Sequence, residues 1–245
     1  MTFFITLCAL LVVVWAWWRF VYFHRNPKRV CPPGDDLVCP ADGRIIYSEV
    51  VDFDAPSSGL RPGGAPAYFD RVRSTWNLSG DWSVIATYLS IFDVHFVRSP
   101  LSGRVRCRNI PVVGRNLSME WPMVAAILKR PLPLGRRGYC DKNEILCVNI
   151  EGDIPVVLVL MADWWIRQIE TFVPEGAWVE RGQVLAQIRM GSQVDVWVPS
   201  GRATFTRSHF DTVFAGETIL GVKTPEPPVV HAADQVEIAG VFQRE

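Results

Sequence analysis

Lysine is scarce in this chain of 245 residues. Only Lys28, Lys129, Lys142 and Lys223 occur among the 25 basic side chains, so arginine supplies most of the positive charge. A cofactor held as a lysine adduct therefore has few attachment points. The formal net charge is zero at pH 7, which gives no reason to expect a nucleic-acid partner.

Cysteine and histidine are also sparse. The 6 cysteines form no CxxC pair and no cluster with metal-ligand spacing, so we expect reduced thiols and no metal site. Only 4 histidines are present, which leaves few candidates for a histidine acid or base. They are His24, His95, His209 and His231.

One long apolar run opens the chain. Residues 3–18 carry no charge, and residues 19–23 add only Arg19. About 20 apolar residues span a bilayer, so we expect residues 1–23 to form a membrane anchor helix. A cleaved signal peptide is disfavoured, because no basic segment precedes the run and no small-residue cleavage site follows it. The positive-inside rule, applied to Arg25, Lys28 and Arg29, predicts a single-pass protein of the inner (cytoplasmic) membrane with its main domain in the cytoplasm.

After this run the pattern changes to short apolar stretches separated by Gly, Pro and Asp. Such stretches are typical of strands, and helical periodicity is weak, so the predicted class is mainly β within a β-rich α+β fold. The expected strands are residues 84–89, 145–150, 156–161 and 178–188, and the expected helix is residues 119–128. Residues 54–80 and 130–143 are expected loops, and residues 224–245 are an expected flexible tail.

Two short patterns recur along the chain. A turn with Gly-Arg begins at Pro40, Pro100 and Pro199, and Val179–Ala186 is similar to Val213–Leu220. In each pattern a glycine turn joins two strands whose apolar residues face a common core. The repeats predict a barrel-sandwich-like β domain with pseudo-symmetric halves, which resembles biotinyl and lipoyl domains.

The Gly191-Ser192 pair lies between two apolar strands, where such a pair commonly makes a hairpin turn. A biotinyl or lipoyl carrier would need a lysine at this tip, but none lies between Lys142 and Lys223. A membrane-fusion adaptor of an export pump would need a long helical hairpin with heptads, which the sequence lacks. A non-catalytic, membrane-anchored adaptor or carrier-like domain is the alternative to an enzyme.

A serine directly after a glycine also permits self-cleavage. If Ser192 Oγ attacks the Gly191 carbonyl carbon, the peptide becomes an ester, and β-elimination then releases the upstream chain. Hydrolysis of the resulting dehydroalanine leaves a pyruvoyl group and ammonia. This ketone can form a Schiff base with a substrate amine and accept the electrons of a departing carboxylate, as pyridoxal phosphate does.

Several motifs appear in a fixed order over residues 23–221. They are Phe23-His-Arg-Asn-Pro-Lys-Arg, Cys39-Pro-Ala-Asp-Gly-Arg-Ile, Leu89-Ser-Ile-Phe-Asp-Val-His and Met190-Gly-Ser-Gln-Val-Asp-Val. With them the chain resembles the phosphatidylserine decarboxylases, in particular the short bacterial and archaeal type. The resemblance implies a decarboxylase domain at residues 24–223, self-processed into a β chain (1–191) and an α chain (192–245) that stay associated.

The resemblance also implies roles for single residues. Ser192 is the self-cleaving residue and becomes the covalent pyruvoyl group, Asp42 helps to activate it, and His95 transfers a proton near the substrate. Longer members of the family carry a second histidine where this chain has Arg98, which leaves open the residue that activates Ser192. Asp93 is expected to share a strand face with His95 and to orient its ring. The further supporting positions are Asn143, Glu144 and His209, the last as an alternative base.

The family substrate is phosphatidylserine, so the implied reaction yields phosphatidylethanolamine and carbon dioxide in phospholipid biosynthesis. A membrane anchor suits a lipid that stays in the bilayer, and Trp164 and Trp165 are candidates for contact with its headgroup layer. Besides this lipid and the two cleaved chains, a homodimer is left open as a partner.

Overall fold

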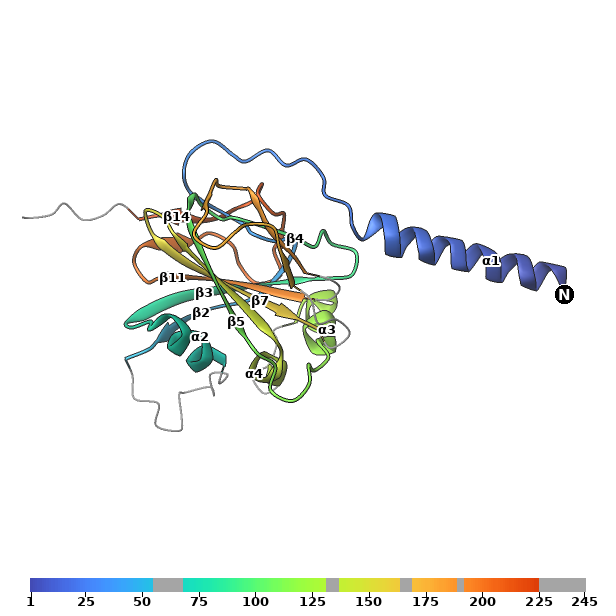
Figure 1. Cartoon of the computed structure of the whole chain (residues 1–245), viewed down its shortest axis with the longest axis horizontal. Helices are drawn as coiled ribbons and strands as arrows, with labels where there is room; N and C mark the ends of the chain where they lie inside the picture. The colour runs from blue at the N-terminus through green and yellow to red at the C-terminus, as the bar shows by residue number, and fades with distance from the viewer. Residues whose placement is uncertain (55–67, 131–136, 164–168, 189–191, 225–245) are drawn as a thin grey trace, which may run out of the picture.

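An apolar helix precedes a β-rich domain in the computed structural model, which describes residues 1–54, 68–130, 137–163, 169–188 and 192–224. The α-helix α1 (Thr2–Trp17) continues into the π-helical turn η1 (Trp18–Tyr22) and extends away from the domain (Figure 1). None of its residues is buried, and its mean hydropathy is 2.0. The expected N-terminal apolar helix is therefore confirmed, and it is long and apolar enough to cross a membrane.

A large antiparallel sheet of eight strands forms the centre of the domain. In spatial order its strands are β13 (Thr212–Val213), β2 (Gly43–Asp52), β3 (Asp81–Leu89), β11 (Ser192–Pro199), β7 (Pro155–Ala162), β6 (Ile145–Glu151), β5 (Gly103–Ile110) and β9 (Trp178–Val179). Strand β11 pairs with β3 on one side and with β7 on the other. The strand that begins at Ser192 is thus an interior strand of this sheet.

Two small sheets cover one face of the large sheet. One has the order β1 (Leu37–Val38), β14 (Ile219–Lys223), β12 (Ala203–Phe205), and the other has the order β4 (Phe96–Arg98), β10 (Val184–Ile188), β8 (Ile169–Thr171). The aliphatic core between the layers includes Leu89, Val97, Leu185, Val194 and Leu220. Val194, Val196 and Val198 of β11 belong to this core, so the even-numbered side chains of β11 face the small sheets.

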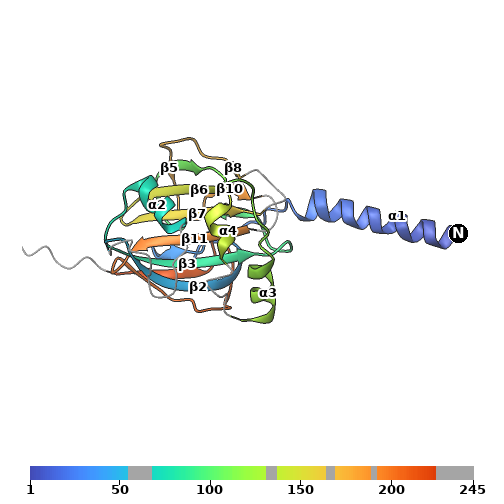
Figure 2. The same cartoon turned by 90° about the horizontal axis from the view of Figure 1, so that it is seen from below.

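Three helices lie on the opposite face (Figure 2): α2 (Tyr68–Trp76), α3 (Glu120–Leu128) and α4 (Gly138–Lys142). Their core is aromatic, with Trp197 stacked on Phe53 at 5.7 Å between ring centroids and edge-on to Phe69 at 5.1 Å. The odd-numbered residues of β11 face this second core. The predicted β-rich class is confirmed.

The predicted repeat is present in the structure. Each copy is a short strand, a glycine turn and a longer strand, β9–β10 in one copy and β13–β14 in the other. Gly182 and Gly216 hold the two turns with φ values of 81° and 73°, which an L side chain rarely adopts. The turns meet, because a Cβ placed on Gly216 would lie 3.8 Å from the Cα of Gly182.

Several local predictions are confirmed and others are wrong. The strands expected at 84–89, 145–150 and 156–161 and the helix expected at 119–128 are present as β3, β6, β7 and α3. Residues 178–188 form two strands, because the Gly182 turn divides them. The segments expected to be loops, 54–80 and 130–143, contain the helices α2 and α4. These helices form because Tyr68, Phe69 and Tyr139 pack into the buried core on this face, a tertiary contact that local composition does not predict.

The hairpin interpretation of Gly191-Ser192 is wrong. Strand β10 pairs with β4 and β8, whereas β11 pairs with β3 and β7. The two flanking strands therefore belong to different layers. Gly191 itself lies outside the described residues, as do Trp164, Trp165, His231 and the tail from residue 225.

Candidate functional site

Ser192 is the first residue of β11 and is paired with Leu89 of β3 and Ala162 of β7. Its side chain is fully buried and points to the same face as Val194, toward the small sheets. Within the described part of the chain, its Oγ has no hydrogen-bond partner. A buried hydroxyl without a partner is costly, so this atom is an exception that a reaction at Ser192 would explain.

His95 lies in the segment between β3 and β4 and is also fully buried. Its Nδ1 is 2.9 Å from the Asp93 carbonyl oxygen, and among the described residues its Nε2 has no partner. Because a carbonyl oxygen only accepts, Nδ1 carries the proton and Nε2 keeps its lone pair. Burial lowers the pKa of His95 to about 4 despite the Asp93 carbonyl, and the charges of Arg25 and His24 lower it further.

The segment that carries His95 also contacts the strand that leads to Ser192. The backbone N–H of Ile188, the last residue of β10, donates to the His95 carbonyl oxygen at 3.0 Å. The imidazole packs on Phe23 with ring centroids 4.3 Å apart. His95 is therefore a neutral base candidate in the layer that Ser192 faces.

The expected orientation of His95 by the Asp93 carboxylate is wrong. Residues 90–95 form a turn rather than a strand, so the two side chains do not share a strand face. The Asp93 carboxylate accepts from the N–H and the hydroxyl of Ser90, both at 2.7 Å, and closes this turn. The backbone carbonyl of Asp93 orients the ring instead.

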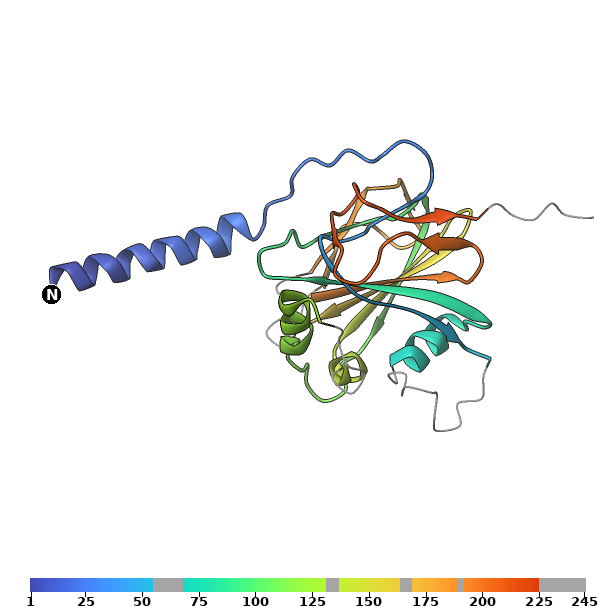
Figure 3. The same ribbon diagram turned by 180° about the vertical axis from the view of Figure 1, so that it is seen from behind.

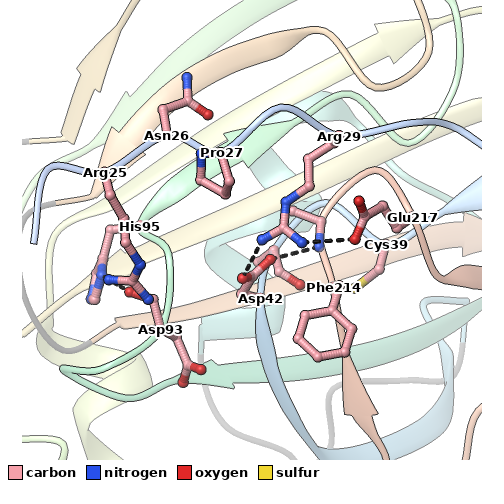
Figure 4. Close-up of polar contacts among 12 residues, drawn as sticks. Arg25, Asn26, Pro27, Arg29, Cys39, Asp42, Asp93, His95, Phe214 and Glu217 are labelled. Atoms are coloured by element: carbon pink, nitrogen blue, oxygen red, sulfur yellow. Dashed lines mark hydrogen bonds and ion pairs between the residues drawn. The ribbon is translucent and has the colours of Figure 1, made fainter. Parts of the chain in front are cut away.

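Asp42 is buried beside the start of β2 (Figure 4). Its Oδ2 accepts from Arg29 at 2.7 Å, and its Oδ1 accepts from the Ala215 N–H at 2.8 Å. Arg29 also pairs with Glu217 at 2.7 Å. Burial raises the pKa of Asp42, although the Ala215 N–H and Arg29 oppose the shift; the nearby Asp93 charge contributes to raising it.

The backbone at Gly43 brings Asp42 to the same end of the sheet as Ser192. A Cβ at Gly43 would lie 2.1 Å from the Tyr88 carbonyl oxygen, so only glycine permits this approach. Tyr88 pairs with Arg44 on one side and with Gln193 on the other. Strand β3 alone therefore separates the Asp42-Gly43 turn from the start of β11.

The remaining predicted residues have other partners. Arg98 donates to Asn26 Oδ1 at 2.7 Å and to the Gly182 carbonyl at 2.9 Å, so it ties the segment after the anchor to the repeat turn. Asn143 donates to the Ala162 carbonyl at 2.9 Å and braces the strand end beside Ser192. Glu144 is half-buried and its carboxylate accepts from Asn109 Nδ2 at 3.3 Å, whereas His209 is exposed in the β12–β13 connection.

The structure adds a buried polar network that the sequence analysis did not identify. Asp195 accepts from the hydroxyls of Tyr47 and Tyr68 at 2.9 and 2.8 Å and from Gln193 Nε2 at 2.7 Å. Gln193 in turn accepts from the Tyr139 hydroxyl at 2.5 Å. Burial raises the pKa of Asp195 to about 6, against the three donated hydrogen bonds. Two polar residues within an otherwise apolar strand, Gln193 and Asp195 in the motif around Ser192, were the sequence signal that could have predicted this network.

A cavity of about 360 Å³ adjoins this end of the sheet on the face that α3 covers, which is opposite to the face that the Ser192 side chain points to. Its apolar wall comes from Met123, Ala126 and Ile127 of α3, and its polar lining comes from Arg44, Tyr88, Ser90, Asp93 and Thr212. Its volume lies in the range of small-molecule sites. An arginine, three hydroxyl-bearing residues and a carboxylate beside an apolar wall suit a ligand with a charged head and an apolar body.

Comparisons with known proteins identify relatives over most of the chain. The family model described as phosphatidylserine decarboxylase matches residues 17–221. The chain is 34% identical over 212 residues to a phosphatidylserine decarboxylase proenzyme of Paramagnetospirillum magneticum, covering 86% of this chain and 72% of that protein. It is 31% identical over 211 residues to the proenzyme of the same name from Nitratidesulfovibrio vulgaris, covering 85% and 80%.

Proposed function

The chain belongs to the phosphatidylserine decarboxylase family, which makes it a carboxy-lyase, and on that premise we propose that it cuts itself between Gly191 and Ser192 and decarboxylates phosphatidylserine. The observation that carries the proposal is Ser192 Oγ, which is buried, lacks a partner among the described residues and follows Gly191 directly. Proenzyme names among the relatives agree with a processed chain.

Maturation begins when Ser192 Oγ loses its proton and attacks the Gly191 carbonyl carbon. The buried position of Ser192 limits competing attack by water on the ester. Asp42 lies at the start of β2, one strand away from Ser192, and its carboxylate helps to remove this proton. Hydrogen bonds from Arg29 and from the Ala215 N–H fix the position of the carboxylate. A carboxylate with a raised pKa is a better proton acceptor than an ordinary one.

Residue 192 fits a pyruvoyl group, because its side chain is fully buried and faces the core between the large sheet and the small sheets. When formed, this group supplies a carbonyl for the substrate amine and an electron sink for the departing carboxylate. His95, neutral and with a free lone pair at Nε2, holds and returns a proton during turnover. Arg44 at the cavity wall supplies positive charge for an anionic headgroup.

The two chains produced by cleavage stay together through strand pairing. On the α chain, β11 lies between β3 and β7, β13 pairs with β2, and β14 pairs with β1. All of these partners belong to the β chain, so breaking one peptide bond leaves every strand pair intact. Helix α1 holds the assembly at the membrane, with the domain on the cytoplasmic side as the basic residues after the anchor predict.

Intact mass of the purified protein tests this function. Wild-type protein gives two chains that end at Gly191 and begin at a blocked residue 192, whereas Ser192→Ala gives one chain of 245 residues. Ser83→Ala, which alters a half-buried serine on the neighbouring strand β3, is the matched control and is still cut. Cleavage of Ser192→Ala at the same bond would assign the cut to another protease and refute self-processing.

A further inference from the structure

Helix α3 is apolar on its outer face as well as on its inner face. After Glu120 it contains no charged residue. Pro122, Ala125 and Ala126 are buried against the domain, whereas Trp121, Ile127 and Leu128 are 47%, 68% and 58% exposed. A helix that is apolar all round is normally covered on both sides, yet Ile127 and Leu128 stay mostly exposed on this outer face.

A second apolar feature lies at the tip of the turn after β3. Ile91 and Phe92 are 36% and 62% exposed. The Phe92 carbonyl oxygen accepts from the hydroxyl of Tyr22 at 3.4 Å and from Arg25 Nη2 at 2.5 Å. Since Tyr22 ends the apolar N-terminal helix, these bonds fix the tip of the turn at the level where the helix meets the domain.

The two features are joined through the cavity beside the site. Ser90 and Asp93 of the turn and Met123, Ala126 and Ile127 of α3 line the same 360 Å³ space. Figure 3 shows α3 and the base of α1 at the same end of the domain, and Figures 1 and 2 agree. Lys129 and Arg130, exposed at the C-terminal end of α3, add positive charge there.

We propose that this surface is a second membrane contact. The interfacial patch consists of Ile91, Phe92, Trp121, Val124, Ile127 and Leu128. It enters the interfacial layer of the bilayer that α1 spans, with Lys129 and Arg130 at the level of anionic headgroups. The cavity then opens at the bilayer surface, so a lipid headgroup enters it, at the end of the sheet where β11 begins, without its acyl chains leaving the membrane. This proposal rests on the lipid substrate and the membrane anchor proposed above.

A bilayer fits the patch better than a second copy of the chain. The patch is continuous with the anchor through Tyr22 and Arg25, so α1 delivers it to the membrane surface whenever the helix is inserted. Its aromatic residues, Phe92 and Trp121, and the adjacent basic pair are the side chains that interfacial segments use. A second copy remains an outcome that the experiment detects.

Photocrosslinking of the full chain in proteoliposomes tests the proposal. The photoreactive amino acid p-benzoylphenylalanine replaces Phe92, Trp121 or Leu128 in protein reconstituted with phosphatidylcholine and phosphatidylserine. The control position is Val50 of β2, which is 66% exposed at the opposite end of the same sheet. We expect lipid adducts at the three patch positions at least tenfold above those at Val50, measured by mass of the irradiated protein. Adducts no more frequent than at Val50, or adducts to a second protein chain, would overturn the proposal.

The crosslinking result is separable from the proposed catalytic function. The same three replacements are also made in the Ser192→Ala variant, which is not expected to cleave itself. A lipid adduct at the patch does not require cleavage, so it can still form in this variant. Adducts in this background support the patch even where self-cleavage or decarboxylation fails. Conversely, a cleaved and active enzyme without adducts refutes the patch and leaves the proposed function intact.

Discussion

Acidification should destabilise the folded protein through His95, and the structure sets the size of this effect. Burial lowers the pKa of His95 from 6.5 to about 4. The unfolded chain therefore binds a proton between these pKa values while the folded chain does not, so stability falls as pH decreases through this range. On acidification from pH 7 to pH 5, the free energy of unfolding falls mainly between pH 6.5, the pKa of the unfolded His95, and pH 5. This range of about 1.5 pH units corresponds to a loss of about 2 kcal/mol at ~1.4 kcal/mol per unit.

Asp195 acts in the opposite direction. Burial raises the pKa of this carboxyl from 3.8 to about 6, so its folded form takes up a proton first and gains stability as pH falls. The two effects largely cancel in the wild type. The contribution of His95 must therefore be measured as a difference between two proteins that both keep Asp195.

The assay compares Ser192→Ala with Ser192→Ala/His95→Asn, because an uncut chain gives a simpler unfolding equilibrium. Asparagine keeps a donor toward the Asp93 carbonyl but does not titrate. Urea unfolding in detergent, followed by tryptophan fluorescence at pH 7 and pH 5, gives each protein's own change in unfolding free energy. We expect the parent protein to lose about 2 kcal/mol more than the double variant on acidification. Equal changes in the two proteins would refute a buried, neutral His95.

Three further predictions concern the reaction. Asp42→Asn should accumulate uncleaved precursor on a gel, because residue 42 loses the carboxylate proposed to support activation of Ser192, whereas Glu217→Gln, which alters the other carboxylate partner of Arg29, should still mature. His95→Ala should mature at least in part yet decarboxylate about 10²–10⁴-fold more slowly per mole of processed α chain; a variant that stays entirely uncut would show that His95 serves both steps. Hydroxylamine should inactivate the mature enzyme by capturing its carbonyl, and activity that survives this treatment or returns with pyridoxal phosphate would contradict a pyruvoyl group.

Local sequence patterns predicted the parts of this molecule that depend on neighbouring residues. The apolar run that forms α1, the strands β3, β6 and β7, and the helix α3 all follow from composition over short windows. The glycine turns of the repeat follow from spacing, since Gly182 and Gly216 occupy the same place in two similar segments. Helix α2 was missed because it forms against Trp197, which lies more than 120 residues away in the chain.

The sequence indicated candidate site residues but not the contacts that they make. The motifs identified Ser192, His95 and Asp42, and the structure places all three at one end of the large sheet or in the layer that faces it. The pairing of Arg29 with Asp42 depends on how the segment after the anchor folds back over the domain. Nor could spacing show that a backbone carbonyl, rather than the Asp93 carboxylate, orients His95.

Strand β11 shows why Ser192 differs from its polar neighbours. An interior strand with three polar side chains in its first four residues is costly unless each finds a partner. Gln193 and Asp195 are bonded to one another and to the tyrosines of the helical face, so they fix the position and register of the strand. Ser192, on the other face, has an Oγ without a partner among the described residues. The same strand therefore supplies both a rigid support and a buried hydroxyl without a partner among the described residues, and the proposed reaction at Ser192 would relieve the cost of burying that hydroxyl.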